Sequence, residues 1–119
     1  MWASTLRVVK AGREPDPYKP RGGMITLDPA RGAQVMPERY RCEVQPVELV
    51  EDDGGGIRVH TRTSWRVITM PGCFIEGLRA SDGVLVDGID GVLEVVGEVG
   101  QWQHPTHGHS EFTVRRWQG

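Results

Sequence analysis

The stretch Ser81–Arg116 reads SDGVLVDGIDGVLEVVGEVGQWQHPTHGHSEFTVRR and consists of short apolar runs separated by turn residues. Its first predicted strand is Val84–Val86 and its second is Val92–Val96. The Asp-Gly pairs between them predict a tight hairpin, because such a turn needs positive φ angles that glycine adopts without steric cost. A further strand is predicted over Phe112–Arg116, so this part of the chain indicates an antiparallel β structure.

Two longer strands are predicted upstream of this stretch. Arg41–Val50 alternates apolar and polar residues, and Pro46 within it indicates an edge strand or a bulge, because proline cannot donate to a sheet ladder. Ile57–Val67 alternates over its whole length, with one face suited to a core and the other carrying arginines. We also expect a short connecting strand over Cys73–Leu78 and no amphipathic helix. Together these strands predict an all-β fold, a small single-domain β-barrel with long loops.

The first 40 residues differ in composition from the rest of the chain. The apolar run Leu6–Val9 could begin a strand, but a glycine and three prolines after it predict no regular element as far as Arg21. These four residues are Gly12, Pro15, Pro17 and Pro20. Met24–Leu27 is a possible short strand. We therefore expect an extended Pro-rich N-terminal arm over residues 1–40, ordered against a neighbouring subunit or wrapped on its own barrel, and a barrel over residues 41–119.

Length and charge narrow the function classes. A chain of 119 residues fits one domain, and its formal net charge of −2 gives no basic excess of the kind that nucleic-acid-binding proteins carry. No apolar run approaches the ~18 residues of a spanning helix and no charged-then-apolar leader opens the chain, so we expect no membrane contact. Cys42 and Cys73 are too few for a disulfide framework, and we expect two reduced thiols.

The histidines near the end of the chain are the candidates for metal ligands. His104, His107 and His109 have a spacing that can place imidazole nitrogens on zinc, with Glu111 or Cys73 as a fourth ligand. Their loop contains proline and glycine and offers no strand or helix to fix ligand geometry, so we predict a solvated polar loop and no metal. The chain also has no P-loop, no Gly-x-Ser-x-Gly motif and no zincin motif. We predict no catalytic residue, no cofactor and no enzymatic activity.

Three arginines lie on one face of the predicted strand Ile57–Val67. Arg58, Arg62 and Arg66 could contact phosphates, which would make the protein a nucleic-acid-binding small β-barrel. They lack the interleaved aromatic residues of a single-strand binding platform. A solvated strand face or a subunit interface is the preferred interpretation, and we include Tyr18 of the arm in that possible interface.

The C-terminal stretch resembles the signature of a known protein family. Ser81–Gly88, followed by Leu93–Trp102 and the loop after it, is similar to the pattern of phage head-closure proteins, the head-to-tail stoppers of long-tailed phages. The residues at the signature positions are Gly88, Val95, Gly97, Trp102, Pro105 and Gly108. The chain departs from the pattern at Leu93, where the family often has Trp or Tyr.

The resemblance implies a structural virion protein of the head–tail neck. Such a subunit forms a homo-oligomeric ring, expected to be a dodecamer, below the portal and adaptor ring and above the tail terminator or tail tube protein. Packaged double-stranded DNA passes through the channel of the ring without sequence-specific contact, and the ring helps to retain the genome after packaging and until ejection. A tail-terminator-like or other minor tail or neck subunit is the alternative within this class.

The resemblance also places channel closure on the segment between the two long strands. Its residues are Glu51, Asp52, Asp53, Gly54, Gly55 and Gly56. Three glycines permit large backbone movement, and three carboxylates repeated around a ring would repel the DNA backbone. Without the resemblance, the same segment is an exposed hairpin tip that is kept polar against aggregation.

Overall fold

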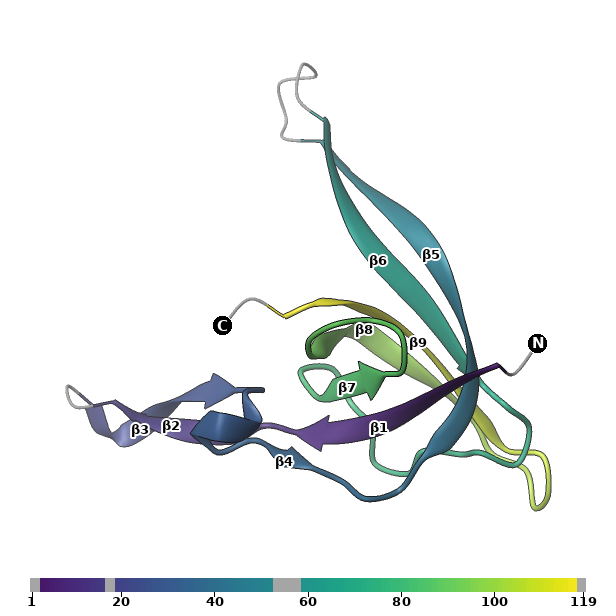
Figure 1. Ribbon diagram of the computed structural model, residues 1–119, viewed down its shortest axis with the longest axis horizontal. Helices are drawn as coiled ribbons and strands as arrows, with labels where there is room; N and C mark the ends of the chain where they lie inside the picture. Colours follow the sequence, from purple (N-terminus) through teal and green to yellow (C-terminus); the bar gives the residue numbers. More distant parts are fainter. Residues whose placement is uncertain (1–2, 17–18, 53–58, 118–119) are drawn as a thin grey trace.

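The computed structural model describes residues 3–16, 19–52 and 59–117, and within these ranges residues 14–24 and 48–63 are described by their backbone alone. The described chain is all β, without an α-helix (Figure 1). Its strands are β1 (Ser4–Lys10), β2 (Gly12–Asp16), β3 (Lys19–Thr26), β4 (Gln34–Val35), β5 (Tyr40–Asp52), β6 (Val59–Thr69), β7 (Gly83–Val86), β8 (Leu93–Trp102) and β9 (His109–Arg116). One turn of 3-10 helix, η1 (Pro29–Arg31), precedes β4.

A closed antiparallel barrel forms the body of the molecule. Six strands follow each other around it in the order β1, β5, β6, β9, β8 and β7, and β7 pairs back onto β1. The closing register runs from Leu6 opposite Val86 to Val9 opposite Gly83. β4 is an extra strand that pairs with the end of β1. The predicted all-β barrel is therefore confirmed.

The barrel interior is filled from alternate positions of its strands, as the period of a half-buried strand requires. On β9, Phe112 and Val114 are buried and the residues between and beside them are partly exposed. The other fully or almost fully buried members of this cluster are Leu6, Val8, Cys42, Val67, Ile75, Leu78, Val84, Val86, Leu93 and Val95. Every barrel strand contributes to this cluster, so the six strands share one core.

A second, smaller cluster lies on the other side of β1. Val9, Leu27 and Ala33 are buried there, and Val35, Leu85, Val92 and Trp117 pack against them. The chain after β3 therefore has its own apolar contact with the barrel. Gly12 is required where β2 begins, because a Cβ at this position would overlap the carbonyl of Gly32.

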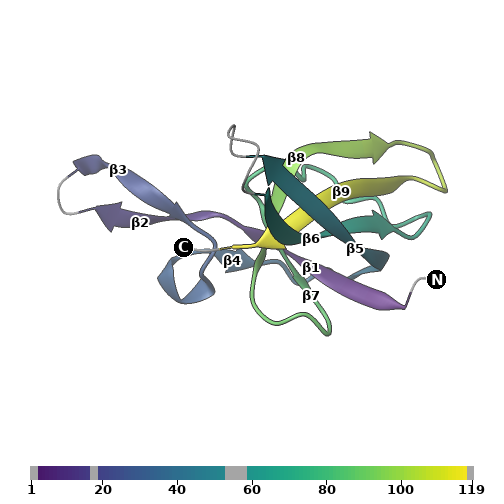
Figure 2. The same ribbon diagram turned by 90° about the horizontal axis from the view of Figure 1, so that it is seen from above.

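Two hairpins project from the barrel in different directions (Figures 1 and 2). β5 and β6 pair continuously from Cys42 opposite Thr69 to Asp52 opposite Val59, but β9 accompanies β6 only as far as Ser64. The far half of this hairpin is therefore a two-stranded ribbon. β2 and β3 form the second ribbon. These projections explain a radius of gyration of 15.8 Å, against about 13.5 Å for a compact chain of this length.

Several predicted strands are confirmed. The Asp-Gly hairpin is present as β7 and β8, with positive φ angles at Gly88 (90°) and Gly91 (83°) in its turn. Pro46 lies at an edge, as expected, since the described part of β5 pairs with β1 only over Tyr40–Cys42. The final strand is longer than predicted and begins at His109.

The predicted strand over Cys73–Leu78 is wrong. This segment is irregular apart from one turn at Glu76 and Gly77, where Gly77 has a positive φ of 77°. Side chains of the barrel take the place of a sheet ladder: Gln101 Nε2 donates to the carbonyl of Ile75 at 2.8 Å, and the amide of Ile75 donates to Ser110 Oγ at 3.1 Å. The run of apolar residues reflects a loop that caps the barrel, not a strand.

The N-terminal region also differs from the prediction of an extended arm without regular structure up to Arg21. β1 is a barrel strand between β5 and β7, and β2 and β3 form a hairpin that contains Pro15 and Pro20. Both strands of an isolated ribbon are edges, where a missing amide donor is tolerated. The register shifts between Glu14 and Asp16, around Pro15.

Candidate functional site

Two residues of the acidic and glycine-rich segment are described, and they lie at the far end of the β5–β6 hairpin. Glu51 and Asp52 are the last residues of β5, opposite His60 and Val59 of β6. Asp53, Gly54, Gly55 and Gly56 lie outside the described residues. The structure thus places Glu51 and Asp52 on the part of the β5–β6 ribbon that β9 does not cover.

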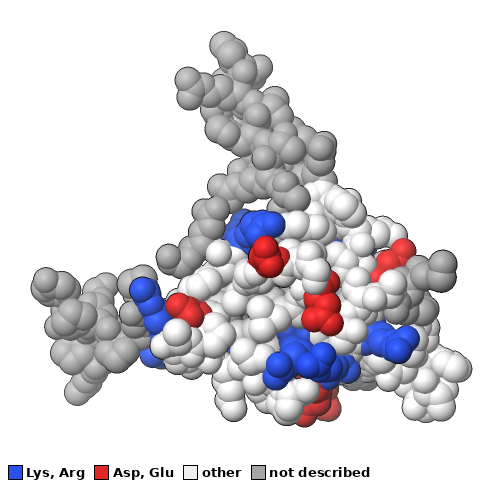
Figure 3. Space-filling view, viewed as in Figure 1, with Lys and Arg blue, Asp and Glu red and all other residues white. Residues whose placement is uncertain are grey.

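The predicted interface residues are only partly described. Arg58 and Tyr18 lie outside the described residues, and Arg62 is placed by its backbone, opposite Leu49. Arg66 is 44% exposed, and its Nη2 atom lies 2.8 Å from Glu111 Oε2. The guanidinium is therefore neutralised by a carboxylate of the neighbouring strand. On the face drawn in Figure 3, blue and red atoms are interspersed over the described residues.

The signature residues stand at positions that shape the barrel. Val95 is a core residue, and Gly97, with a φ of 73°, lies where the β8–β9 register shifts between Val96 and Gly100. Gly88 supplies the positive φ of the β7–β8 turn. The backbone of residues 102–104 leaves little space for a Cβ at Gly108. These contacts are structural, and they do not converge on one site.

Trp102 is the signature residue with a large hydrophobic side chain at the surface, where it is 58% exposed. It stands opposite His109 in the β8–β9 register, and the two rings are stacked with centroids 6.1 Å apart. Pro105 lies in the exposed loop that follows. An exposed tryptophan held by a neighbouring ring is typical of a binding surface rather than of a core.

The histidine loop is held by its own hydrogen bonds. His104 Nδ1 accepts from the amides of Thr106 (3.2 Å) and His107 (3.0 Å), and the rings of His104 and His107 stack at 5.1 Å. His109 Nε2 faces Glu111 Oε1 at 3.3 Å. In the part of the chain that the structure describes, no three His, Cys, Asp or Glu residues come together as metal ligands. The absence of a bound metal remains a prediction.

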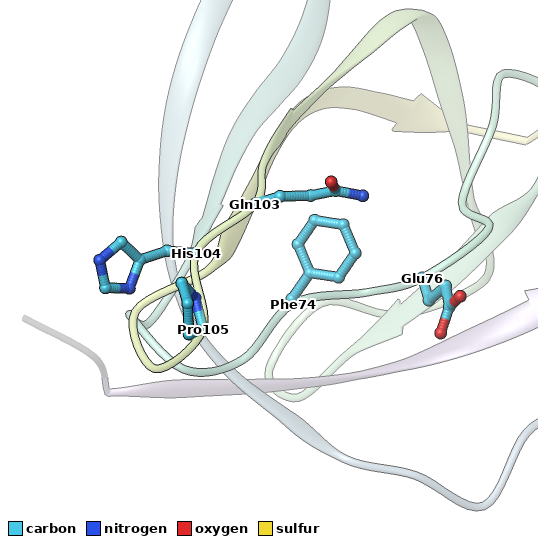
Figure 4. A pocket seen from close by; sticks show the side chains of 5 residues that line it. All are labelled: Phe74, Glu76, Gln103, His104 and Pro105. Carbon is cyan, nitrogen blue, oxygen red and sulfur yellow. The ribbon is translucent and has the colours of Figure 1, made fainter.

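An open hollow of about 480 Å³ lies beside this loop (Figure 4). Phe74 and Glu76 line it from the loop after β6, and Gln103, His104 and Pro105 line it from the loop after β8. Sequence reasoning missed this hollow for two reasons. The segment of Phe74 was expected to be a strand, and the two loops are about 30 residues apart, with no local pattern that connects them.

The two cysteines are free thiols, as expected. Cys42 is fully buried, and burial raises the pKa of its thiol to about 11, with smaller contributions from Asp87 and Cys73. Burial, followed by the charges of Glu38 and Cys73, also raises the pKa of Tyr40. A thiol with a raised pKa is a poor nucleophile. Cys42 is therefore suited to packing in the core.

The described residues form no helix that is long and apolar enough to cross a membrane. No protein-family model matches the sequence, and no curated protein matches it.

Proposed function

We propose that this chain is a structural subunit of the head–tail neck of a long-tailed phage, where it forms a ring that closes the channel after DNA packaging. One observation carries the proposal: a closed barrel supports a hairpin whose far end bears Glu51 and Asp52, the first residues of the acidic, glycine-rich sequence. The resemblance of Ser81–Arg116 to head-closure proteins also supports it, and the role of the acidic, glycine-rich segment in channel closure is taken from that resemblance.

The barrel supplies a rigid base for such a hairpin. β6 is held on both sides from Ser64 to Ile68, by β5 and by β9. From Thr63 to Val59 it pairs with β5 alone, and five residues of strand extend about 17 Å. This reach carries Glu51 and Asp52 away from the barrel wall. A ring of such subunits would direct the hairpins into its channel.

The negative charge of the segment would keep DNA in the channel from adhering to the protein. Glu51, Asp52 and Asp53 are carboxylates that repel phosphates over about one Debye length, roughly 8 Å at physiological ionic strength. Repeating them around a ring adds the repulsion of every copy. The glycines that follow give the backbone the freedom to exchange between closed and open positions. The partners of this role are the portal and adaptor ring, the tail and the packaged DNA.

Assembly provides the first test. We expect sedimentation velocity to reveal concentration-dependent rings, or rings that form on addition of the portal–adaptor complex, and electron micrographs of particles to place the subunit in the neck. A protein that stays monomeric and binds neither the portal–adaptor complex nor the tail contradicts the proposal.

Deletion of Asp52–Gly56 provides the second test. The barrel should remain folded, because the pairing of β6 with β9 begins only at Ser64. Particles that contain the deleted protein should package DNA and then lose it, measured as nuclease-accessible DNA over time. The control is Glu38→Gln, which removes a carboxylate outside the β5–β6 hairpin and should leave retention unchanged. Full particles that stay stable with the deletion would exclude the gating role.

A further inference from the structure

Two large hydrophobic side chains are strongly exposed among the described residues, Ile25 at 60% and Trp102 at 58%. Ile25 is near the end of β3, and Trp102 is the last residue of β8. The end of β3 and the end of β8 lie on opposite sides of the barrel in both ribbon views (Figures 1 and 2). The molecule therefore exposes two different apolar features on opposite sides.

A hollow of about 360 Å³ borders Ile25. The small side chains of Ala11, Ala80 and Ser81 line it together with Ile25. Arg79 adds a cationic group, and Lys10 and Asp82 add an ion pair. This volume lies at the lower end of the range for sites that hold small organic groups, about 300–1,000 Å³. An aromatic side chain is the natural occupant of such a site, because it buries a large apolar area and its ring face attracts Lys and Arg.

The wall of this hollow is fixed by hydrogen bonds. Lys10 Nζ lies 2.9 Å from Asp82 Oδ2 and 3.3 Å from the carbonyl of Gly77. The same carboxylate oxygen accepts from the amide of Arg79 at 3.1 Å. Ser81 lies between Arg79 and Asp82 in the chain and has a positive φ of 78°. A non-glycine residue adopts this conformation only where its surroundings hold it. The hollow is thus present before any partner arrives.

Trp102 is equally prepared for binding. Its ring lies against His109 at an interplanar angle of 16°, so the side chain is partly ordered in the free subunit. Gly100, two residues before it on β8, carries no side chain that would cover the indole, and a Cβ there would lie 3.5 Å from Trp102 Nε1. An aromatic anchor that is already ordered loses less entropy on association.

We propose that Trp102 of one copy inserts into the hollow beside Ile25 of the next copy. The contact joins two different surfaces, so it is a head-to-tail interface, and repetition of such an interface closes a ring or extends a filament. The inference rests on the proposed function, for which it names the partner, a second copy of this chain, and the residues in contact. The indole meets apolar side chains and the guanidinium of Arg79.

Three single variants, and a mixture of two of them, test the interface. Trp102→Ala removes the inserted ring and keeps the hollow, whereas Ile25→Asp alters the hollow and keeps the ring. Ala80→Phe fills the hollow without adding a charge. Matched controls are Glu98→Ala, an exposed change on β8, and Gln34→Asp, which adds the same charge as Ile25→Asp on exposed β4. Circular dichroism and thermal unfolding confirm that each variant is folded.

We expect sedimentation equilibrium to give an association constant reduced on the order of tenfold or more for Trp102→Ala, Ile25→Asp and Ala80→Phe, and unchanged for the controls. An equimolar mixture of Trp102→Ala and Ile25→Asp should form heterodimers and nothing larger, because one intact ring meets one intact hollow. A monomeric wild type, a Trp102→Ala protein that associates like wild type, or a mixture that stays monomeric overturns the inference.

The proposed function fails in a different way. Oligomers that depend on Trp102 but do not bind the portal–adaptor complex would support the interface and contradict the neck role. Trp102→Ala rings that assemble normally and close particles would support the neck role and contradict the interface.

Discussion

Ser64 and Ser110 are both fully buried, but their hydroxyls have opposite surroundings. Ser110 Oγ accepts from the amide of Ile75 and donates to Gln101, so it links β9 to the capping loop and to β8. Ser64 Oγ has no hydrogen-bond partner among the described residues. A buried hydroxyl without a partner has lost its hydration without compensation.

The first prediction compares these two serines. Ser64→Ala should leave the free energy of unfolding unchanged or raise it, because it removes an uncompensated polar group. Ser110→Ala should lower it by about 1–3 kcal/mol, because it leaves buried groups of Ile75 and Gln101 unpaired. Urea unfolding of the two variants measures the difference. If both variants lost the same free energy of unfolding, the hydroxyl of Ser64 would have a hydrogen-bond partner in solution.

The second prediction concerns pH and Cys42. The pKa of its thiol is raised from 9.0 to about 11 in the folded protein, so the folded state keeps a proton that the unfolded state releases. The stabilisation is fully present below about pH 9 and is lost as the pH rises toward 11, by on the order of 2 kcal/mol. The pKa of Tyr40 is also raised, so its ionisation likewise lowers the free energy of unfolding as the pH rises, at higher pH than for Cys42.

Cys42→Ala isolates the contribution of the thiol. The variant retains Tyr40, so the difference in unfolding free energy between wild type and variant should shrink between about pH 8 and pH 11. A difference that stays constant would contradict the assignment. In the folded protein, we expect alkylating reagents to label Cys73, which is partly exposed, well before Cys42.

At the scale of elements, sequence reasoning succeeded where a pattern is local. The Asp-Gly turn predicted the β7–β8 hairpin, and the alternation around Val67 predicted β6. It failed at Cys73–Leu78, because hydrogen bonds with Gln101 and Ser110, far along the chain, hold this apolar segment as a loop. The hollow beside Phe74 was missed for the same reason. Sites that form between distant loops leave no periodic signal in the sequence.

The third prediction concerns the attachment of the β2–β3 hairpin. Leu27 follows β3 directly, is 2% exposed and belongs to the smaller cluster with Val9 and Ala33. Leu27→Ala should lower the free energy of unfolding by about 2–5 kcal/mol, because it opens a cavity between the hairpin and the barrel. Ile25→Ala, two residues earlier but 60% exposed, is the control and should have little effect on unfolding.

Thermal unfolding measures stability, and hydrogen exchange of the β2–β3 amides measures whether the hairpin is loosened. Equal effects of Leu27→Ala and Ile25→Ala would contradict the anchoring role of the smaller cluster.

At the scale of the whole molecule, the barrel depends on its first strand. The expected division into an arm over residues 1–40 and a barrel over residues 41–119 overlooks β1, whose partners are β5 on one side and β7 on the other. Pairing between Leu6 and Val86 spans most of the chain, and no local pattern in the sequence reveals it.

The fourth prediction follows from this closure. The fragment of residues 41–119 lacks β1 and leaves an open sheet with two edges, where core residues such as Val84 and Val86 lose their cover. We expect it to show no cooperative thermal transition, and we expect addition of a peptide of residues 1–40 to restore one. A fragment that unfolds cooperatively by itself would restore the predicted boundary at residue 40.

The pairing of β1 with β7 also orders events during synthesis. At about 5–20 residues per second, the ribosome reaches Val86 roughly 4–16 s after Leu6. Until then, the apolar side chains of Leu6, Val8 and Val9, all buried in the finished barrel, have no partner strand on that side. We therefore expect translation speed and chaperone access to the nascent N-terminus to affect the yield of closed barrels, because β1 lacks this partner until β7 has been made.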